Sequence, residues 1–143
     1  MEQKKYLNKV LIIFSDFYPE ISSNLLKGAE NYLKKHKFLF DKIKVPGTLE
    51  IPFIFEKYKH KYKGYIILGC VIRGETDHYD IVKDITLDFL YKKAFNEKLP
   101  LSCSILTVEN YAQALERSDL KKKNLGEKSA IACLSLIRLL NEK

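Results

Sequence analysis

The chain alternates short apolar runs with longer stretches in which apolar residues recur every three or four positions. The short runs predict buried strands, and the longer stretches predict helices with one face on a core. Residues 10–15 and 64–68 are continuous apolar runs of the kind found in central strands of a parallel sheet. Residues 101–107 predict a further strand, and the less apolar segment 38–45 predicts a strand at the sheet edge.

Helical spacing predicts five helices between and after these strands. Ile21, Leu25, Ala29 and Leu33 form one apolar stripe, so we expect the first helix to follow the turn at residues 16–19 and to run to about Lys35. The others are expected to run from the segment 46–52 to about Tyr58, from Asp77 to about Glu97, from Glu109 to Arg117, and from Asn124 onward.

The last of these helices has a broader apolar face than a surface helix needs. That face consists of Ala130, Ile131, Leu134, Ile137 and Leu140. We expect it to pack on the sheet and also on a neighbouring chain, because a large exposed apolar patch usually marks an interface.

The order of the elements predicts an α/β fold, a three-layer α/β/α sandwich of flavodoxin-like type. Its four-stranded sheet is expected to be parallel, with right-handed crossovers and helices on both faces. The 143 residues suffice for one domain with a proper core and leave little room for a second. We therefore expect a single domain over residues 1–143.

Composition indicates an ordinary globular protein, with 46% hydrophobic residues and few Gly or Pro. An apolar stretch of membrane-spanning length is absent from the sequence, so we expect no membrane association. Residues 1–5 lead straight into the first strand, which predicts no signal peptide and a cytoplasmic location.

The cysteines are odd in number, widely spaced, and lack a Cys-x-x-Cys pair. Cys70, Cys103 and Cys133 are therefore expected to be small buried hydrophobes in a reducing compartment. The three histidines share no ligand-like spacing with them, so the sequence predicts no metal site.

A net charge of +7 raises the possibility of a nucleic-acid partner. The lysines, however, are scattered near expected helix ends and loops, where a solvated face is the usual explanation. We therefore expect no nucleic-acid partner. Arginine is more informative because only Arg73, Arg117 and Arg138 occur, and a guanidinium fork suits an oxyanion.

The segment 69–80 concentrates the candidate chemistry, because a strand ends there and a helix is expected to begin near Asp77. Such a turn directs backbone N–H groups and a helix dipole at an anion, and Gly74 lets the backbone approach a ligand. Thr76 or Asp77 could cap the helix, and His78 is expected in its first turn. Glu75 and Asp77 bring negative charge there, so we expect them to point away or to pair with Arg73. Spacing alone leaves both a structural turn and a functional site open.

The same segment reads Gly-Cys-Val-Ile-Arg-Gly-Glu-Thr-Asp-His-Tyr-Asp, and this run closely resembles the signature of the lumazine synthases. Two further stretches resemble that family: the Pro-Gly-x-x-Glu segment ending at Glu50, and the Thr-x-x-Asn-x-x-Gln-Ala-x-x-Arg stretch ending at Arg117. The resemblance covers the chain from about Val10 to its end.

The resemblance implies a role for each candidate site residue. His78 is expected to be the acid/base, and Phe17 to stack on the pyrimidine of the substrate. Thr48, Leu49 and Glu50 are expected to hold its ribityl chain. The phosphate turn and the strand before it supply the substrate-binding residues Cys70, Val71, Ile72, Glu75 and Thr76. Cys103 and Arg117 are expected to come from a neighbouring chain, with Arg117 clamping phosphate.

The reaction implied is condensation of 5-amino-6-(D-ribitylamino)uracil with 3,4-dihydroxy-2-butanone 4-phosphate, a step of riboflavin biosynthesis. The products are 6,7-dimethyl-8-ribityllumazine, phosphate and water. The family needs no metal and no redox cofactor, so the protein's task is orientation and proton transfer, for which a histidine is suited near neutral pH. Family sites lie between adjacent subunits of a homopentamer.

Three positions depart from the usual family pattern: Leu49 and Cys103 stand where phenylalanine is common, and Leu125 replaces a lysine. These changes bear on affinity, because neither the acid/base nor the arginine is lost.

Other interpretations stay open at this stage. The chain could bind flavin-type ligands without turnover. An FMN-binding flavodoxin-like module is disfavoured because no Ser/Thr/Gly-rich loop follows the first strand. The assembly also stays open between a free pentamer and a 60-chain shell, and the short segment before the first strand favours the pentamer. Association with a riboflavin synthase stays open as well.

Overall fold

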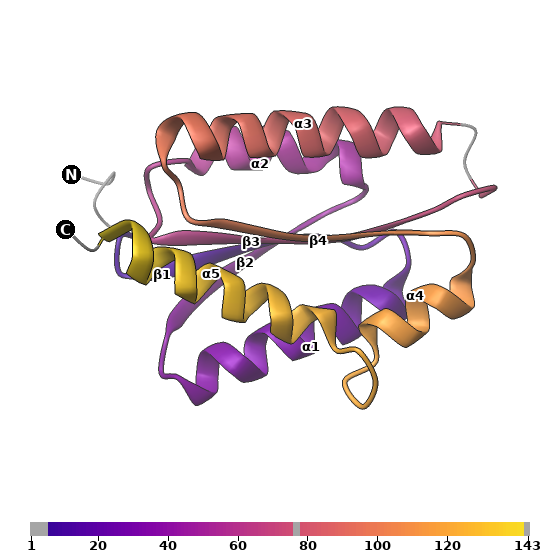
Figure 1. Ribbon diagram of the computed structural model, residues 1–143, viewed down its shortest axis with the longest axis horizontal. Helices are drawn as coiled ribbons and strands as arrows, with labels where there is room; N and C mark the ends of the chain where they lie inside the picture. The colour runs from indigo at the N-terminus through magenta and orange to yellow at the C-terminus, as the bar shows by residue number, and fades with distance from the viewer. Residues whose placement is uncertain (1–5, 76–77, 142–143) are drawn as a thin grey trace.

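The computed structural model describes residues 6–75 and 78–141, which form three layers (Figure 1). Helices α2 and α3 cover one face of a central sheet, and helices α1, α4 and α5 cover the other. The elements in chain order are β1 Lys9–Ser15, α1 Pro19–Lys35, β2 Leu39–Val45, a 3-10 turn η2 Thr48–Glu50, α2 Ile51–Tyr58, β3 Gly64–Ile72, α3 Tyr79–Glu97, β4 Leu101–Val108, α4 Tyr111–Ser118 and α5 Leu125–Asn141.

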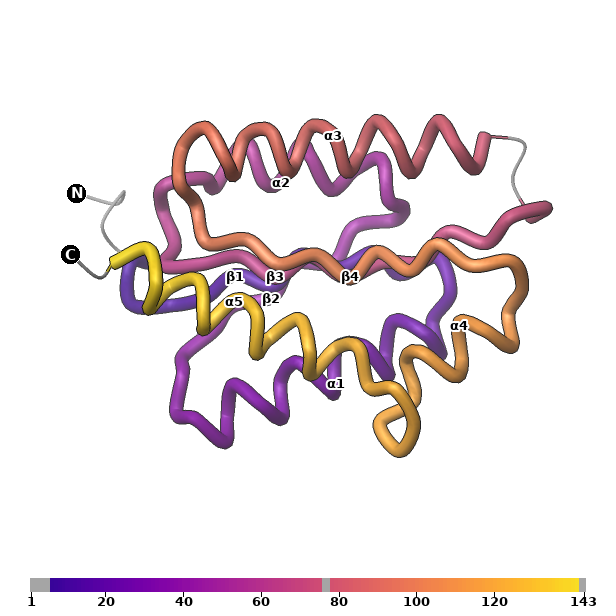
Figure 2. Tube along the Cα trace, viewed as in Figure 1, coloured from indigo at the N-terminus to yellow at the C-terminus, as the bar shows by residue number. Residues whose placement is uncertain are grey.

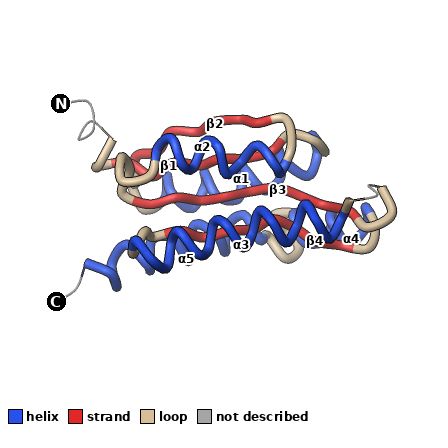
Figure 3. The backbone as a smooth tube through the Cα atoms, turned by 90° about the horizontal axis from the view of Figure 1, so that it is seen from above, coloured by secondary structure: helices blue, strands red, loops and turns tan. Residues whose placement is uncertain are grey.

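The sheet has the strand order β2-β1-β3-β4, and every neighbouring pair is parallel. Figure 3 shows β2 at one edge and β4 at the other. All nine residues of β3 are buried. The predicted α/β sandwich, its central strands and the edge position of residues 38–45 are therefore confirmed.

Each central strand contributes to two cores because its side chains alternate between the faces of the sheet. Ile12 and Ile66 pack under α1, α4 and α5, whereas Ile13 and Ile67 pack under α2 and α3. The predicted stripe of α1 is fully buried in the first core; its members are Ile21, Leu25, Ala29 and Leu33. Burial of each larger side chain contributes about 1.5–3 kcal/mol, which is why the sequence pattern fixes the orientation of the helix.

Helices α1 and α5 approach each other closely through a glycine. A Cβ atom at Gly126 would lie 2.1 Å from the carbonyl oxygen of Leu25. No side chain fits there without displacing the backbone of α1. This contact fixes the first turn of α5 against the middle of α1.

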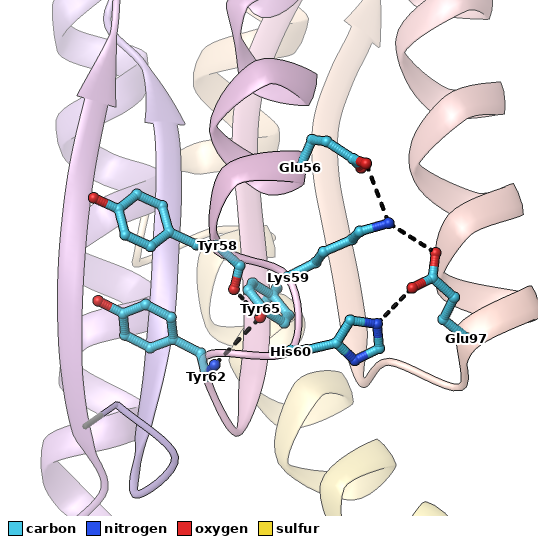
Figure 4. Close-up of polar contacts among 7 residues, drawn as sticks. All are labelled: Glu56, Tyr58, Lys59, His60, Tyr62, Tyr65 and Glu97. Carbon is cyan, nitrogen blue, oxygen red and sulfur yellow. Dashed lines mark hydrogen bonds and ion pairs between the residues drawn. The ribbon is translucent and has the colours of Figure 1, made fainter. Parts of the chain in front are cut away.

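A polar cluster fastens the loop after α2 to the end of α3 (Figure 4). Lys59 Nζ lies 3.1 Å from carboxylate oxygens of both Glu56 and Glu97. His60, which has a positive φ of 68°, places its Nε2 2.5 Å from the other oxygen of Glu97. The Tyr65 hydroxyl donates to the carbonyl of Tyr58, the last residue of α2. This cluster lies at the amino end of β3, away from the carboxyl ends of the strands.

Two details differ from the sequence-based expectations. Helix α3 begins at Tyr79 rather than near Asp77, because the apolar spacing after residue 80 marks the helix face but not its first residue. Cys70 and Cys133 are buried as expected, whereas Cys103 lies on the edge strand β4 and is partly exposed. All three cysteines are free thiols. Within the described residues, no helix is both long enough and apolar enough to cross a membrane.

The last helix is also only half covered within this chain. Ala130 and Ile137 are buried against the sheet, as expected. Ile131 and Leu140, from the same predicted face, are 38% and 46% exposed. Part of that apolar face therefore stays on the surface of a single chain.

Candidate functional site

A pocket of about 180 Å³ lies at the carboxyl ends of β1 and β3. This is the end of the sheet at which β3 and β4 lead toward α3 and α4 (Figure 2). In open α/β sheets, ligands bind outside the carboxyl ends of the strands. The pocket is lined by Phe17, Tyr18, Gly47, Thr48, Leu49, Glu50, Cys70, Val71, Ile72 and Val82. Seven of the residues singled out in the sequence thus meet in one place.

Phe17 is presented by the short loop between β1 and α1. Pro19 begins α1, where its missing N–H costs nothing, so the chain must turn sharply at residues 16–18. The Phe17 ring is 65% exposed and meets the Tyr18 ring edge-on at 5.0 Å between centroids. Phe17 is therefore not packed into the core of the chain, and most of its surface is accessible at the pocket.

The 3-10 turn Thr48–Glu50 forms the second wall of the pocket. Its first residue, Thr48, is buried, and Leu49 and Glu50 are exposed. The backbone N–H of Glu50 donates to the Gly47 carbonyl at 3.2 Å, which closes the turn. The Glu50 carboxylate makes no hydrogen bond or ion pair with any other described residue, so its oxygens remain available to accept from hydroxyl groups.

The end of β3 supplies the floor of the pocket through Cys70, Val71 and Ile72. Burial, together with the nearby charge of Glu75, raises the pKa of the Cys70 thiol to about 12. Cys70 is therefore a neutral, weakly polar thiol at physiological pH, and a nucleophilic role does not fit it.

The turn after β3 differs from expectation in the partner of Glu75. Gly74 has a φ of 85°, a left-handed conformation that favours glycine. Glu75 accepts a hydrogen bond from the Tyr18 hydroxyl at 3.0 Å. Burial of the Tyr18 hydroxyl is the larger cause of its raised pKa, and the hydrogen bond to Glu75 is the second. Arg73 instead pairs with Glu109 and Asp80, so of the two alternatives expected for Glu75, pairing with Arg73 is wrong. Thr76 and Asp77 lie outside the described residues.

His78 occupies the N-cap position of α3, one residue before the helix rather than in its first turn. Its side chain is exposed and is not among the residues that line the pocket. Its carbonyl accepts from the backbone N–H of Val82 at 2.8 Å, and Val82 does line the pocket. The first turn of α3 therefore links the candidate acid/base to the pocket wall.

Two predicted site residues lie elsewhere in this chain. Cys103, on β4, faces a separate hollow of about 240 Å³ shared with Tyr91 and Lys128. Arg117 lies on α4 and is partly exposed, and its guanidinium makes no hydrogen bond or ion pair with the rest of the described chain. Neither residue lines the pocket described above.

Sequence reasoning missed three pocket residues, namely Tyr18, Gly47 and Val82. Tyr18 and Gly47 are direct neighbours of residues that were identified, and Val82 is four positions after His78, one helical turn further on. Among the described residues there is no group of three or more His, Cys, Asp or Glu side chains placed to hold a metal ion.

Comparison with known proteins places this architecture in a family. A family model described as 6,7-dimethyl-8-ribityllumazine synthase matches residues 8–141. Proteins of that name from Bartonella tribocorum and Bartonella bacilliformis are 43% and 44% identical to this chain; both comparisons cover 97% of the chain, and 94% and 95% of the relatives. The relative of the same name from Beijerinckia indica is 39% identical over 94% of this chain and 76% of its own length. The chain therefore belongs to the 6,7-dimethyl-8-ribityllumazine synthase family.

Proposed function

We propose that this protein condenses 5-amino-6-(D-ribitylamino)uracil with 3,4-dihydroxy-2-butanone 4-phosphate to form 6,7-dimethyl-8-ribityllumazine. The observation that carries the proposal is the pocket at the carboxyl end of the sheet, which gathers seven of the residues that the resemblance implies for substrate binding. Such pockets combine apolar walls with a few placed polar groups, and this one has both.

The two walls of the pocket are proposed to bind different parts of the pyrimidine substrate. The exposed face of Phe17 is placed to stack on the pyrimidine ring, and the unpaired carboxylate of Glu50 is placed to accept hydrogen bonds from ribityl hydroxyls. The end of β3 lies between them, so residues 70–72 would contact the heterocycle. Both contacts fix orientation, which is the main requirement of a condensation between two bound substrates.

His78 is proposed to move protons during the reaction. An amine of the pyrimidine attacks the butanone carbonyl, and a first water leaves to give an imine. Phosphate is then eliminated, and attack of the second amine on the remaining carbonyl closes the ring with loss of a second water to complete the lumazine. Each step needs a proton delivered to a leaving oxygen or taken from carbon or nitrogen, and imidazole can do both near neutral pH. His78 directly precedes Tyr79 and Asp80, which contact Arg73 in the turn after β3, and this supports a role for His78 near the proposed phosphate site.

We further propose that the working protein is a cytoplasmic homopentamer with sites shared between chains. A pocket of about 180 Å³ is small beside the roughly 300–1,000 Å³ of typical ligand sites, so one chain does not enclose both substrates. Cys103 and Arg117 lie away from the pocket of their own chain. A neighbouring chain that brings them in would enlarge the site and supply a cation for the phosphate.

A turnover assay tests the proposed reaction directly. The purified protein is incubated with both substrates, and lumazine absorbance is followed together with phosphate release. We expect the two products to form in equal amounts. Tight binding of the pyrimidine without either product would refute the enzymatic function and favour a ligand-binding protein instead.

Mixed pentamers test the shared site. His78→Ala and Arg117→Ala proteins are expected to be nearly inactive alone, whereas co-expression places an intact His78 beside an intact Arg117. In a head-to-tail ring with random mixing, about a quarter of the interfaces carry both intact residues, and activity should rise above that of either parent. Mixed pentamers, verified by mass, with no more activity than the average of the parents would place both residues in one chain's site.

A further inference from the structure

Arg73, the first residue after β3, contacts two separate parts of the chain. Its Nε donates to Glu109 Oε2 at 3.0 Å, and its Nη1 lies 4.0 Å from Asp80 Oδ2. Its guanidinium carbon lies 4.5 Å from the centroid of the Tyr79 ring, close enough for a cation–π contact. Its backbone N–H donates to the Val108 carbonyl at 2.9 Å. The residue therefore joins the end of β4 to the start of α3.

The contacts on α3 fall on the two residues that directly follow His78. Tyr79 is 7% exposed and belongs to the core under α2 and α3, so its ring is a fixed surface for the guanidinium. Asp80 is on the first turn of the same helix. An arginine held by both has little freedom relative to the N-cap position, where His78 stands.

Glu109, the partner of Arg73 after β4, is itself held in place by further hydrogen bonds. Ile72 pairs with Val108 in the sheet register, and Arg73 and Glu109 are the residues that directly follow the two strands. The backbone N–H of Glu109 donates to Gln113 Oε1 at 2.8 Å, and Asn110 caps α4 by accepting from the Gln113 N–H at 2.9 Å. Glu109 is thus part of an ordered strand-to-helix turn rather than a loose surface carboxylate.

This arrangement does not fit the use first considered for Arg73, binding of an oxyanion. Two carboxylates already surround its single positive charge, and the bond to Glu109 raises the pKa of the guanidinium further. A phosphate would have to approach Glu109 and Asp80 or displace them. Arg117, whose guanidinium pairs with no other described residue, has no such competitor.

We propose that Arg73 is a positioning residue that holds His78 in register with the substrate pocket by bracing the start of α3 against the end of β4. The proposal rests on the proposed function of His78 as the acid/base. Arg73 and Glu109 side chains are 50% and 60% exposed, and exposed ion pairs contribute little to global stability. The consequence of the brace is therefore the placement of His78 rather than the stability of the fold.

The test compares Arg73→Gln with Arg73→Lys, Glu109→Gln and a matched control, Lys83→Gln. Lys83 also contacts Asp80, at 3.7 Å, and lies 5.5 Å from the Tyr79 centroid, but among the described residues it has no contact to Glu109. Arg73→Gln should lower kcat about 10- to 100-fold, since a misplaced catalytic group loses rate on this scale. KM for the pyrimidine should change less than about twofold, because that substrate is proposed to be bound by Phe17 and Glu50 rather than by Arg73 or His78.

The other variants sharpen the expectation. Arg73→Lys should recover part of kcat because it keeps the charge but loses the planar fork. Glu109→Gln should lower kcat in the same direction as Arg73→Gln and by less, and Lys83→Gln should match the wild type. A normal kcat in folded Arg73→Gln would overturn the proposal. So would an unchanged kcat with a raised KM for the phosphorylated substrate, because that result would make Arg73 a phosphate ligand.

Amide hydrogen exchange supplies a measurement that does not depend on turnover. The Val82 N–H, bonded to the His78 carbonyl, reports on the first turn of α3. It should exchange about tenfold faster in Arg73→Gln than in the wild type, and at the wild-type rate in Lys83→Gln. An equal exchange rate of the Val82 N–H in all three proteins would refute the proposal that Arg73 holds the start of α3 in place. An inactive wild-type protein would instead refute the proposed function and leave this comparison intact.

Discussion

Replacing Phe17 by alanine tests the most specific claim about substrate binding, that its ring stacks on the pyrimidine. The ring is 65% exposed in the free chain, and it meets the Tyr18 ring edge-on at 5.0 Å. Its removal should therefore change the free energy of unfolding by no more than about 0.5 kcal/mol, as for most surface substitutions. Any large effect must then come from ligand binding.

The expected effect on binding follows from the area that the ring can offer. A phenylalanine side chain presents about 200 Å² in all, so an exposure of 65% leaves about 130 Å² uncovered. A flat ligand on one face covers roughly half of this, which corresponds to about 1.6 kcal/mol at about 25 cal/mol per Å². Stacking geometry adds about 0.5–1.5 kcal/mol. The total of about 2–3 kcal/mol predicts a Kd that is about 30- to 150-fold weaker.

Titration calorimetry with the pyrimidine substrate alone, under anaerobic conditions, measures this Kd. The matched control is Phe95→Ala, because Phe95 is 73% exposed but lies in the last turn of α3, at the other end of the helix from the pocket. Both variants are compared at the same oligomeric mass. A Phe17→Ala Kd within twofold of the wild type would show that the ring does not contact the pyrimidine.

Three further changes test other parts of the site and fold. His78→Ala should lower kcat about 10- to 10³-fold with the fold intact, and an unchanged kcat would remove His78 from the mechanism. Cys103→Phe should tighten binding of the pyrimidine by about 1 kcal/mol, measured as Kd, and a weaker Kd would mean that the pocket is remodelled there. Hydrogen bonds from His60 and Lys59 lower the pKa of Glu97, so the ionised carboxylate stabilises the fold above its ordinary pKa and this stabilisation disappears as pH falls through the lowered value. Glu97→Gln should therefore lower Tm at pH 7 but not in strong acid, and a Tm difference independent of pH would contradict the role of the carboxylate.

The sequence predicted the elements well because their apolar patterns report burial directly. The nine-residue strand β3 is buried throughout, and the stripe from Ile21 to Leu33 is fully covered. The start of α3 was harder to place from pattern alone, since Ile81, Val82 and Ile85 have helical spacing wherever the first residue lies. Residues 76–77, the expected capping residues, are outside the described chain.

Side-chain partners were harder to predict than the pocket itself. Seven pocket residues were anticipated because the resemblance carries them in short contiguous motifs. Glu109 lies 36 positions from Arg73 in sequence, and the two meet only because Ile72 pairs with Val108. Strand register decides such a pair, and β3, buried along its whole length, carries no polar alternation that would specify the register. Placement of Cys103 and Arg117 away from the pocket likewise follows from topology, not from either residue's local sequence.

The strand order β2-β1-β3-β4 has a consequence for how the chain is made. Synthesis releases the amino-terminal part first, so β1 can pair with β2 while β3 has not yet appeared. Until Gly64–Ile72 emerges, one edge of the highly apolar β1 is unpaired, and an open apolar edge is a template for another chain. The interval between the completion of α2 and the arrival of β3 is thus the stage at which the nascent protein most needs a chaperone. Truncated chains that end before residue 64 should aggregate, although every segment they contain is well packed in the finished fold.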